Sequence, residues 1–137
     1  MKIRILKTAT AGQIKKQFNA EYPYLKIEFL IIPALKSGSR HPAIVPDNVT
    51  LGSMQPHVLE GVIMVNEMMS VGELEQCFKN HLLDVQVFRQ SENLWLETTM
   101  TDSWSLVKQN THGKEISEFK YENPENSYLN GIVNNAG

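Results

Sequence analysis

The chain contains two copies of one sequence pattern, and this duplication constrains its fold more than any other feature. Residues 1–30 align with residues 61–88 at a nearly constant offset. The matched stretches are Lys2-Ile3-Arg4-Ile5 with Val62-Ile63-Met64-Val65, Thr10-Ala11-Gly12-Gln13-Ile14 with Ser70-Val71-Gly72-Glu73-Leu74, and Phe18 with Phe78. A tandem duplication indicates one structural unit used twice, and it assigns no activity.

Each copy begins with a short apolar strand that leads directly into a helix. Thr10 with Gln13, and Ser70 with Glu73, fit the capping box, in which each side chain bonds the other residue's amide. The helices then present apolar side chains at a spacing of four, namely Ile14, Phe18 and Tyr22 in the first copy and Leu74, Phe78 and Leu82 in the second. We expect this stripe to pack on a sheet.

Alternating apolar residues at 26–32 and 84–89 predict strands, and residues 94–98 complete a hairpin in the second copy. Asp47 and Asp102 precede apolar turns and are expected to cap two short helices, the second ending at Gly113. We therefore predict an α+β fold of two tandem βαββα repeats, about 1–55 and 56–113. They form a mixed or antiparallel sheet with helices on one face and an internal pseudo-twofold. Residues 1–113 form one domain, and 114–137 a partly flexible C-terminal extension.

The composition is that of an ordinary globular chain that is not cross-linked by disulfides. The single Cys77 excludes an internal disulfide, and no apolar run approaches the roughly 20 residues that span a bilayer. Charges interrupt the basic start at Lys2 and Arg4 before a signal-peptide core can form. We expect a soluble, cytoplasmic protein.

The two copies differ in charge. Residues 1–55 contain eight Lys and Arg against three Asp and Glu, whereas residues 56–110 contain three against eight. Either the two copies attract each other, within a chain or between chains, or the charged side chains simply lie on solvated faces and do not interact. The net charge of −2 argues against general binding to nucleic acid or membranes.

Candidate binding residues concentrate in the second copy. Trp95 and Trp104 are the two tryptophans of the chain, and Trp95 alternates with Leu94 and Leu96 along a strand. If the leucines face the core, Trp95 lies on the opposite face, covered within the molecule or serving as an interaction anchor. Thr101 and Asp102 lie in a run rich in hydroxyls and carboxylates from Glu97 onward, but they also suit a helix cap.

Other candidates have weaker patterns. Lys36 and Arg40 flank Ser-Gly-Ser, a composition that can wrap an anion, but no aromatic side chains are interleaved for base stacking. His57 and His112 occupy matching places, yet nothing near them completes a tetrahedral metal shell. We predict no metal and no cofactor.

The second copy also carries a resemblance to known proteins. The stretches Ser70-Val71-Gly72-Glu73-Leu74-Glu75, Val85-Gln86-Val87-Phe88-Arg89, Trp95-Leu96-Glu97-Thr98 and Thr101-Asp102-Ser103-Trp104-Ser105-Leu106 with Gln109-Asn110 resemble small uncharacterised bacterial domains. The first copy matches loosely, because Val49 replaces the tryptophan. The resemblance implies a bacterial protein and carries no activity.

No catalytic motif accompanies this duplicated scaffold, so we predict a non-catalytic protein-interaction module. It acts through the groove between copies, an exposed strand edge or the aromatic second half, as a monomer or homodimer. The alternative is a small enzyme or small-ligand-binding protein with a site near Glu97–Asp102 and His112.

Overall fold

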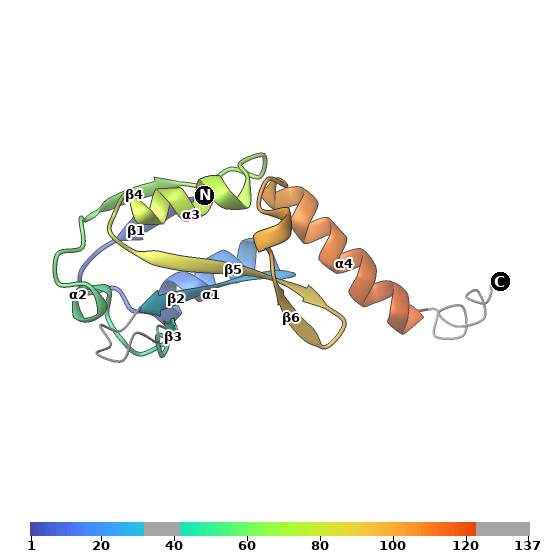
Figure 1. Cartoon of the computed structure of the whole chain (residues 1–137), viewed down its shortest axis with the longest axis horizontal. Helices are drawn as coiled ribbons and strands as arrows, with labels where there is room; N and C mark the ends of the chain where they lie inside the picture. The colour runs from blue at the N-terminus through green and yellow to red at the C-terminus, as the bar shows by residue number, and fades with distance from the viewer. Residues whose placement is uncertain (32–41, 123–137) are drawn as a thin grey trace.

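The computed structural model describes residues 1–31 and 42–122, which form an α+β protein with helices packed against antiparallel strands (Figure 1). The elements are β1 (Lys2–Ile5), α1 (Ala11–Glu21), β2 (Leu25–Ile31), β3 (Ala43–Ile44), α2 (Leu51–Met54), β4 (Gly61–Met64), α3 (Val71–Lys79), β5 (Asp84–Ser91), β6 (Leu94–Glu97), a 3-10 turn (Thr99–Thr101) and α4 (Leu106–Glu122). Lys36, Arg40 and residues 123–137 of the predicted extension lie outside the described residues.

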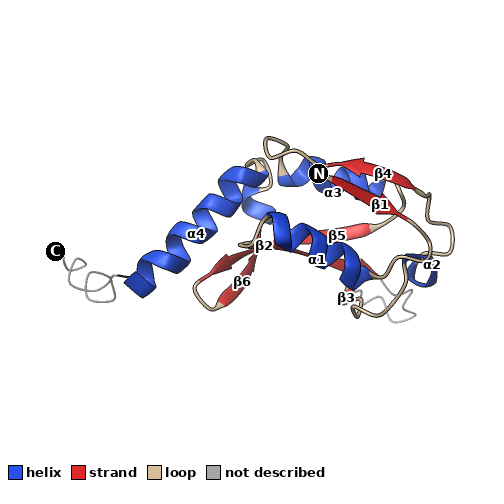
Figure 2. Ribbon diagram, turned by 180° about the vertical axis from the view of Figure 1, so that it is seen from behind, coloured by secondary structure: helices blue, strands red, loops and turns tan. Residues whose placement is uncertain are grey.

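The described strands form two antiparallel sheets rather than one. β1 pairs with β4, with Ile3 opposite Ile63, and the second sheet has the order β3-β2-β5-β6. In its central pair, Glu28 of β2 lies opposite Gln86 of β5. α1 packs against β2 and α3 against β5 (Figure 2). The enclosed apolar core includes Ile3, Ile5, Phe18, Leu25, Ile27, Phe29, Leu74, Phe78 and Val87.

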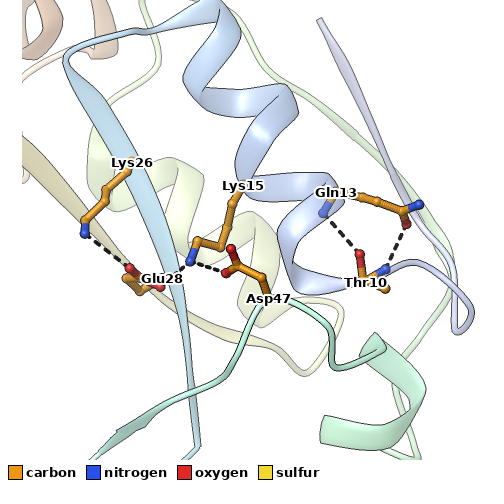
Figure 3. Close-up of polar contacts among 6 residues, drawn as sticks. All are labelled: Thr10, Gln13, Lys15, Lys26, Glu28 and Asp47. Atoms are coloured by element: carbon orange, nitrogen blue, oxygen red, sulfur yellow. Dashed lines mark hydrogen bonds and ion pairs between the residues drawn. The ribbon is translucent and has the colours of Figure 1, made fainter.

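Both predicted capping boxes are confirmed. Thr10 Oγ1 accepts a hydrogen bond from Gln13 N at 3.2 Å, and Gln13 Oε1 accepts one from Thr10 N at 2.9 Å (Figure 3). Ser70 and Glu73 make the equivalent bonds at 3.0 and 2.8 Å. Each box satisfies amides that the first helical turn leaves without partners, so these residues fix where α1 and α3 begin.

The apolar stripes pack on the core except at one end. Leu82 is 44% exposed, so its assignment to the stripe is wrong. α3 ends at Lys79, and Leu82 adopts a positive φ of 68° in the following turn. The turn buries the next residue, Leu83, in its place.

The expectation that Asp47 and Asp102 cap the helices that follow them is also wrong. The cap of α2 is Thr50, whose side chain accepts from Ser53 N at 3.2 Å. At the start of α4 this position is filled by Ser105, whose Oγ accepts from Lys108 N at 3.1 Å. The aspartates act through their backbone carbonyls instead, since Gly12 N donates to Asp47 O at 2.8 Å and Gly72 N to Asp102 O at 2.9 Å. Both aspartates are thereby held beside the first turn of a longer helix.

α4 is a long helix that passes through Gly113 instead of stopping there (Figure 1). A Cβ atom at Gly113 would lie 3.0 Å from Tyr24 Cβ and 3.1 Å from both Arg89 Cγ and Gln90 O. The glycine therefore allows close packing on the sheet rather than ending the helix. None of the helices at residues 1–31 and 42–122 is long and apolar enough to cross a membrane.

Candidate functional site

A cleft lies between α3, the start of β5 and the turn that precedes α4. Its volume is about 340 Å³, and its lining includes Gly72, Glu75, Gln76, Lys79, Leu83, Asp84, Val85 and Asp102. Val71 N donates to Trp104 O at 3.1 Å and Gly72 N to Asp102 O at 2.9 Å. These bonds to the helix N-terminus hold the Asp102 segment against α3 and so shape one wall of the cleft.

Glu75 is the half-buried carboxylate of this cleft. Its Oε2 accepts a hydrogen bond of 3.2 Å from Val87 N, an amide at the edge of β5. Burial raises the pKa of Glu75, and the negative charge of Asp102 raises it further, against the opposing effect of the Val87 bond. A carboxyl with a raised pKa beside a second carboxyl in a cleft marks a candidate site for a cation or a proton.

The aligned position in the first copy carries a lysine. Lys15 Nζ lies 2.7 Å from Glu28 Oε1 and 2.6 Å from Asp47 Oδ1, and Lys26 also reaches Glu28, at 3.3 Å (Figure 3). Burial acts to lower the pKa of Lys15, but hydrogen bonds to Asp47 and Glu28 outweigh it, so the pKa is raised. This ion-pair network is closed within the chain.

The rim of the cleft carries a further ion pair. Lys79 Nζ lies 2.7 Å from Asp84 Oδ1, and both side chains are largely exposed. An exposed pair of this kind contributes little to stability. Lys79 is thus engaged at the rim, and none of the other residues described along this cleft is a lysine that could take the place of Lys15 in the first copy.

A second cluster surrounds Trp104 at the start of α4. Lys108 Nζ lies 4.4 Å from the centroid of the Trp104 ring, Arg89 Cζ 5.7 Å from it, and the His112 ring packs edge-on at 5.4 Å. A shallow pocket of about 280 Å³ lies beside Trp104, Lys108 and His112 and also includes Glu115. Cation–π contacts of this kind stabilise the protein without a ligand.

Gln109 connects this cluster to the turn before α4. It is fully buried, its Oε1 accepts from Arg89 Nη1 at 2.8 Å, and its Nε2 donates to Thr101 O at 2.7 Å and Thr101 Oγ1 at 2.8 Å. Burial lowers the pKa of Arg89, whose buried Nε has no hydrogen-bond partner among the described residues. Thr101 is therefore part of a structural network.

The structure distributes the predicted site residues over separate places. Asp102 lines the cleft with Glu75, whereas His112 packs against Trp104 in the other pocket. Trp95 lies half-buried on the sheet, with Lys26 Nζ 5.1 Å from its ring centroid. Leu94 and Leu96, which were expected to face the core if Trp95 faced away from it, are 65% and 41% exposed.

Sequence reasoning missed Glu75 and Gln109. A signal for Glu75 was present, because a charge is reversed between aligned positions of the two copies, Lys15 and Glu75. For Gln109 there was none, since a polar residue on a helix is exposed by default. Within residues 1–31 and 42–122, no group of three or more His, Cys, Asp and Glu side chains is arranged to hold a metal ion.

Comparison of the chain with protein-family models, with curated protein sequences and with solved structures found no match.

Proposed function

We propose that this chain is a non-catalytic interaction module, built from two related βαββα units, that binds a lysine or arginine side chain of a partner protein in the Glu75–Asp102 cleft. The pairing of aligned residues supports the two-unit arrangement. Ile3 lies opposite Ile63, and Glu28 opposite Gln86. A twofold axis through both pairs would exchange the two units.

The isolated bridges support the same arrangement. Thr10 bridges Thr50 in the first unit, and Ser70 bridges Ser105 in the second. These four residues align between the copies, and each lies just before a helix. The same crossed contact between helix N-termini thus occurs once in each unit.

The charge reversal between Lys15 and Glu75 is the observation that carries the functional proposal. In the first unit, the ammonium group of Lys15 lies between Glu28 and Asp47. In the second unit, Glu75 takes the place of that lysine and faces a cleft shared with Asp102. The first unit is closed by its own cation, and the second leaves room for a cation from outside.

The surroundings of the cleft favour a cationic partner. Residues 56–110 carry five more acidic than basic side chains, a field that attracts positive groups toward this half of the molecule. A bound ammonium or guanidinium group would offset the mutual repulsion of Glu75 and Asp102. The negative charge of Glu75 would then be favoured, so binding would lower its pKa.

An NMR titration with a short Lys- and Arg-containing peptide tests the proposal, with an acidic peptide of equal length as the reference ligand. We expect amide shifts for Gly72, Glu75 and Asp102 with the basic peptide alone, weakening as salt is raised. Glu75→Lys should abolish the shifts, because the new lysine fills the cleft.

Glu115→Lys is the matched control for this titration. It makes the same charge change on α4, in the pocket beside Trp104. We expect it to retain binding. If Glu115→Lys weakens binding as much as Glu75→Lys does, attraction to net charge explains the result and the cleft is not a specific site.

The raised pKa of Glu75 also favours a second candidate function. A carboxyl that stays protonated at higher pH, beside a second carboxyl in the same cleft, suits general acid–base chemistry on a small molecule. A small ligand that raises the melting temperature of the natural protein, but not that of Asp102→Asn, would support this function over the interaction module.

A further inference from the structure

β6 forms an open edge of the four-stranded sheet. It pairs with β5 alone, and Figure 1 shows no described strand beyond it. Proteins protect such edges with charged side chains, proline, bulges or very short strands. Of these devices β6 has one charged residue, Glu97, and a length of four residues, but no lysine or proline. β6 has the sequence Leu94-Trp95-Leu96-Glu97, and Leu94, Leu96 and the nearby Met100 are 65%, 41% and 96% exposed. This edge is suited to pairing with another strand.

The hydrogen-bond pattern defines which backbone groups of β6 are available. Thr98 N donates to Val87 O at 3.3 Å, so this pair is hydrogen-bonded in the β5–β6 ladder. In antiparallel strands, backbone groups of successive residues point alternately toward and away from the neighbouring strand. Leu94 and Leu96 therefore direct their amides and carbonyls at β5, and Trp95 and Glu97 direct theirs at the open edge.

We propose that this edge pairs antiparallel with β6 of a second copy of the chain, across a twofold axis at Leu96. In this register Leu96 lies opposite Leu96 of the second copy, and Trp95 lies opposite Glu97 of the second copy. All the outward amides and carbonyls of Trp95 and Glu97 then form hydrogen bonds. This proposal is independent of the Glu75–Asp102 cleft.

Neighbouring registers of the β6–β6 pairing are less favourable. An axis at Glu97 would place two carboxylates directly opposite each other, which is unfavourable. An axis at Trp95 would pair Glu97 with Asn93, a residue of the hairpin turn outside β6. The axis at Leu96 avoids both problems and places two exposed leucines in contact. The surface is self-complementary, as a twofold interface requires.

The geometry of the Leu96 pair permits a direct test by disulfide formation. Residues opposite each other in a non-hydrogen-bonded pair have Cα atoms about 4.5 Å apart, a spacing that a disulfide can bridge. In a Cys77→Ala background, Leu96→Cys should therefore give a disulfide-linked dimer under mild oxidation, seen on a non-reducing gel.

Leu94→Cys in the same background is the matched control. Leu94 is the more exposed of the two leucines, so random collisions would link it faster. In the proposed register it lies opposite Thr98 of the second copy and has no cysteine partner. We expect Leu96→Cys to cross-link at least tenfold faster than Leu94→Cys, and the reverse order would overturn the register.

The oligomeric state of the natural sequence provides a second measurement. The full chain should show a molar mass that rises with concentration toward that of a dimer in light scattering coupled to gel filtration. Glu97→Pro removes an outward amide while leaving the amides directed at β5, and should give a monomer with unchanged circular dichroism. Glu97→Ala keeps the amide and should still dimerise. A natural chain that stays monomeric at every concentration would refute the proposal, even if Leu96→Cys cross-links.

Discussion

Replacing Gln109 tests whether α4 is attached to the sheet mainly by hydrogen bonds. Between Val107 and Glu118, the part of α4 whose side chains are described, the buried residues are Gln109, Gly113 and Ser117, none of which is a large apolar residue. Gln109→Met is the informative change, because methionine has a similar length and volume but cannot donate to Thr101. The variant separates hydrogen bonding from packing.

The expected loss follows from the bonds that Gln109 makes. It accepts one bond from the charged Arg89 guanidinium and donates two to Thr101. A bond to a charged group contributes about 1.5–3 kcal/mol and a neutral bond about 0.5–1.5 kcal/mol. Arg89 and Thr101 are partly exposed, so water replaces some of this. We therefore use the lower part of these ranges and expect Gln109→Met to lower the free energy of unfolding by about 2.5 kcal/mol.

Urea denaturation followed by circular dichroism would measure this difference. Gln109→Ala should lose at least as much, because it also leaves a cavity. Thr101→Val, which removes one acceptor, should lose less than either. If Gln109→Met costs under about 1 kcal/mol, the network contributes no more than an exposed polar contact and the argument for polar attachment of α4 fails.

Three further predictions concern particular side chains. The pKa of Glu75 is raised above the ordinary value of 4.5, so its ionised carboxylate destabilises the folded state as the pH rises above 4.5. Glu75→Gln should therefore raise the melting temperature at pH 7 but not below pH 4.5. Ser70→Ala should cost about 1 kcal/mol of stability in denaturant titrations through loss of the cap, and a neutral result would contradict the capping box. Gly113→Ala should lower the melting temperature because its Cβ would lie 3.0 Å from Tyr24 Cβ, whereas Gly72→Ala, whose nearest neighbour is at 3.5 Å, should not.

Local sequence patterns predicted the elements whose formation depends on near neighbours. The starts of α1 and α3 followed from Thr10 and Ser70, and the β5–β6 hairpin from alternation around a polar break. Asp102 was named as a candidate, but its partner Glu75 was not, because helix and turn are 27 residues apart in sequence and meet only in the fold.

Predictions based on single residues failed where a distant contact decided the outcome. Gly113 has the local character of a helix stop, yet α4 continues because the glycine fits closely against Tyr24 and Arg89. Leu82 continues the apolar spacing of its helix, yet the turn after Lys79 exposes it.

The sequence by itself determined the α+β class, the α1 and α3 helix starts and the charge difference between the halves, because these depend on residue type and short-range spacing. Only the tertiary structure decided that the strands form two sheets and that β6 lies at an open edge. It also decided that Lys15 pairs with two carboxylates while Glu75 faces a cleft. Those features depend on which distant segments become neighbours, and the free energy of such contacts is not encoded in any short stretch of the chain.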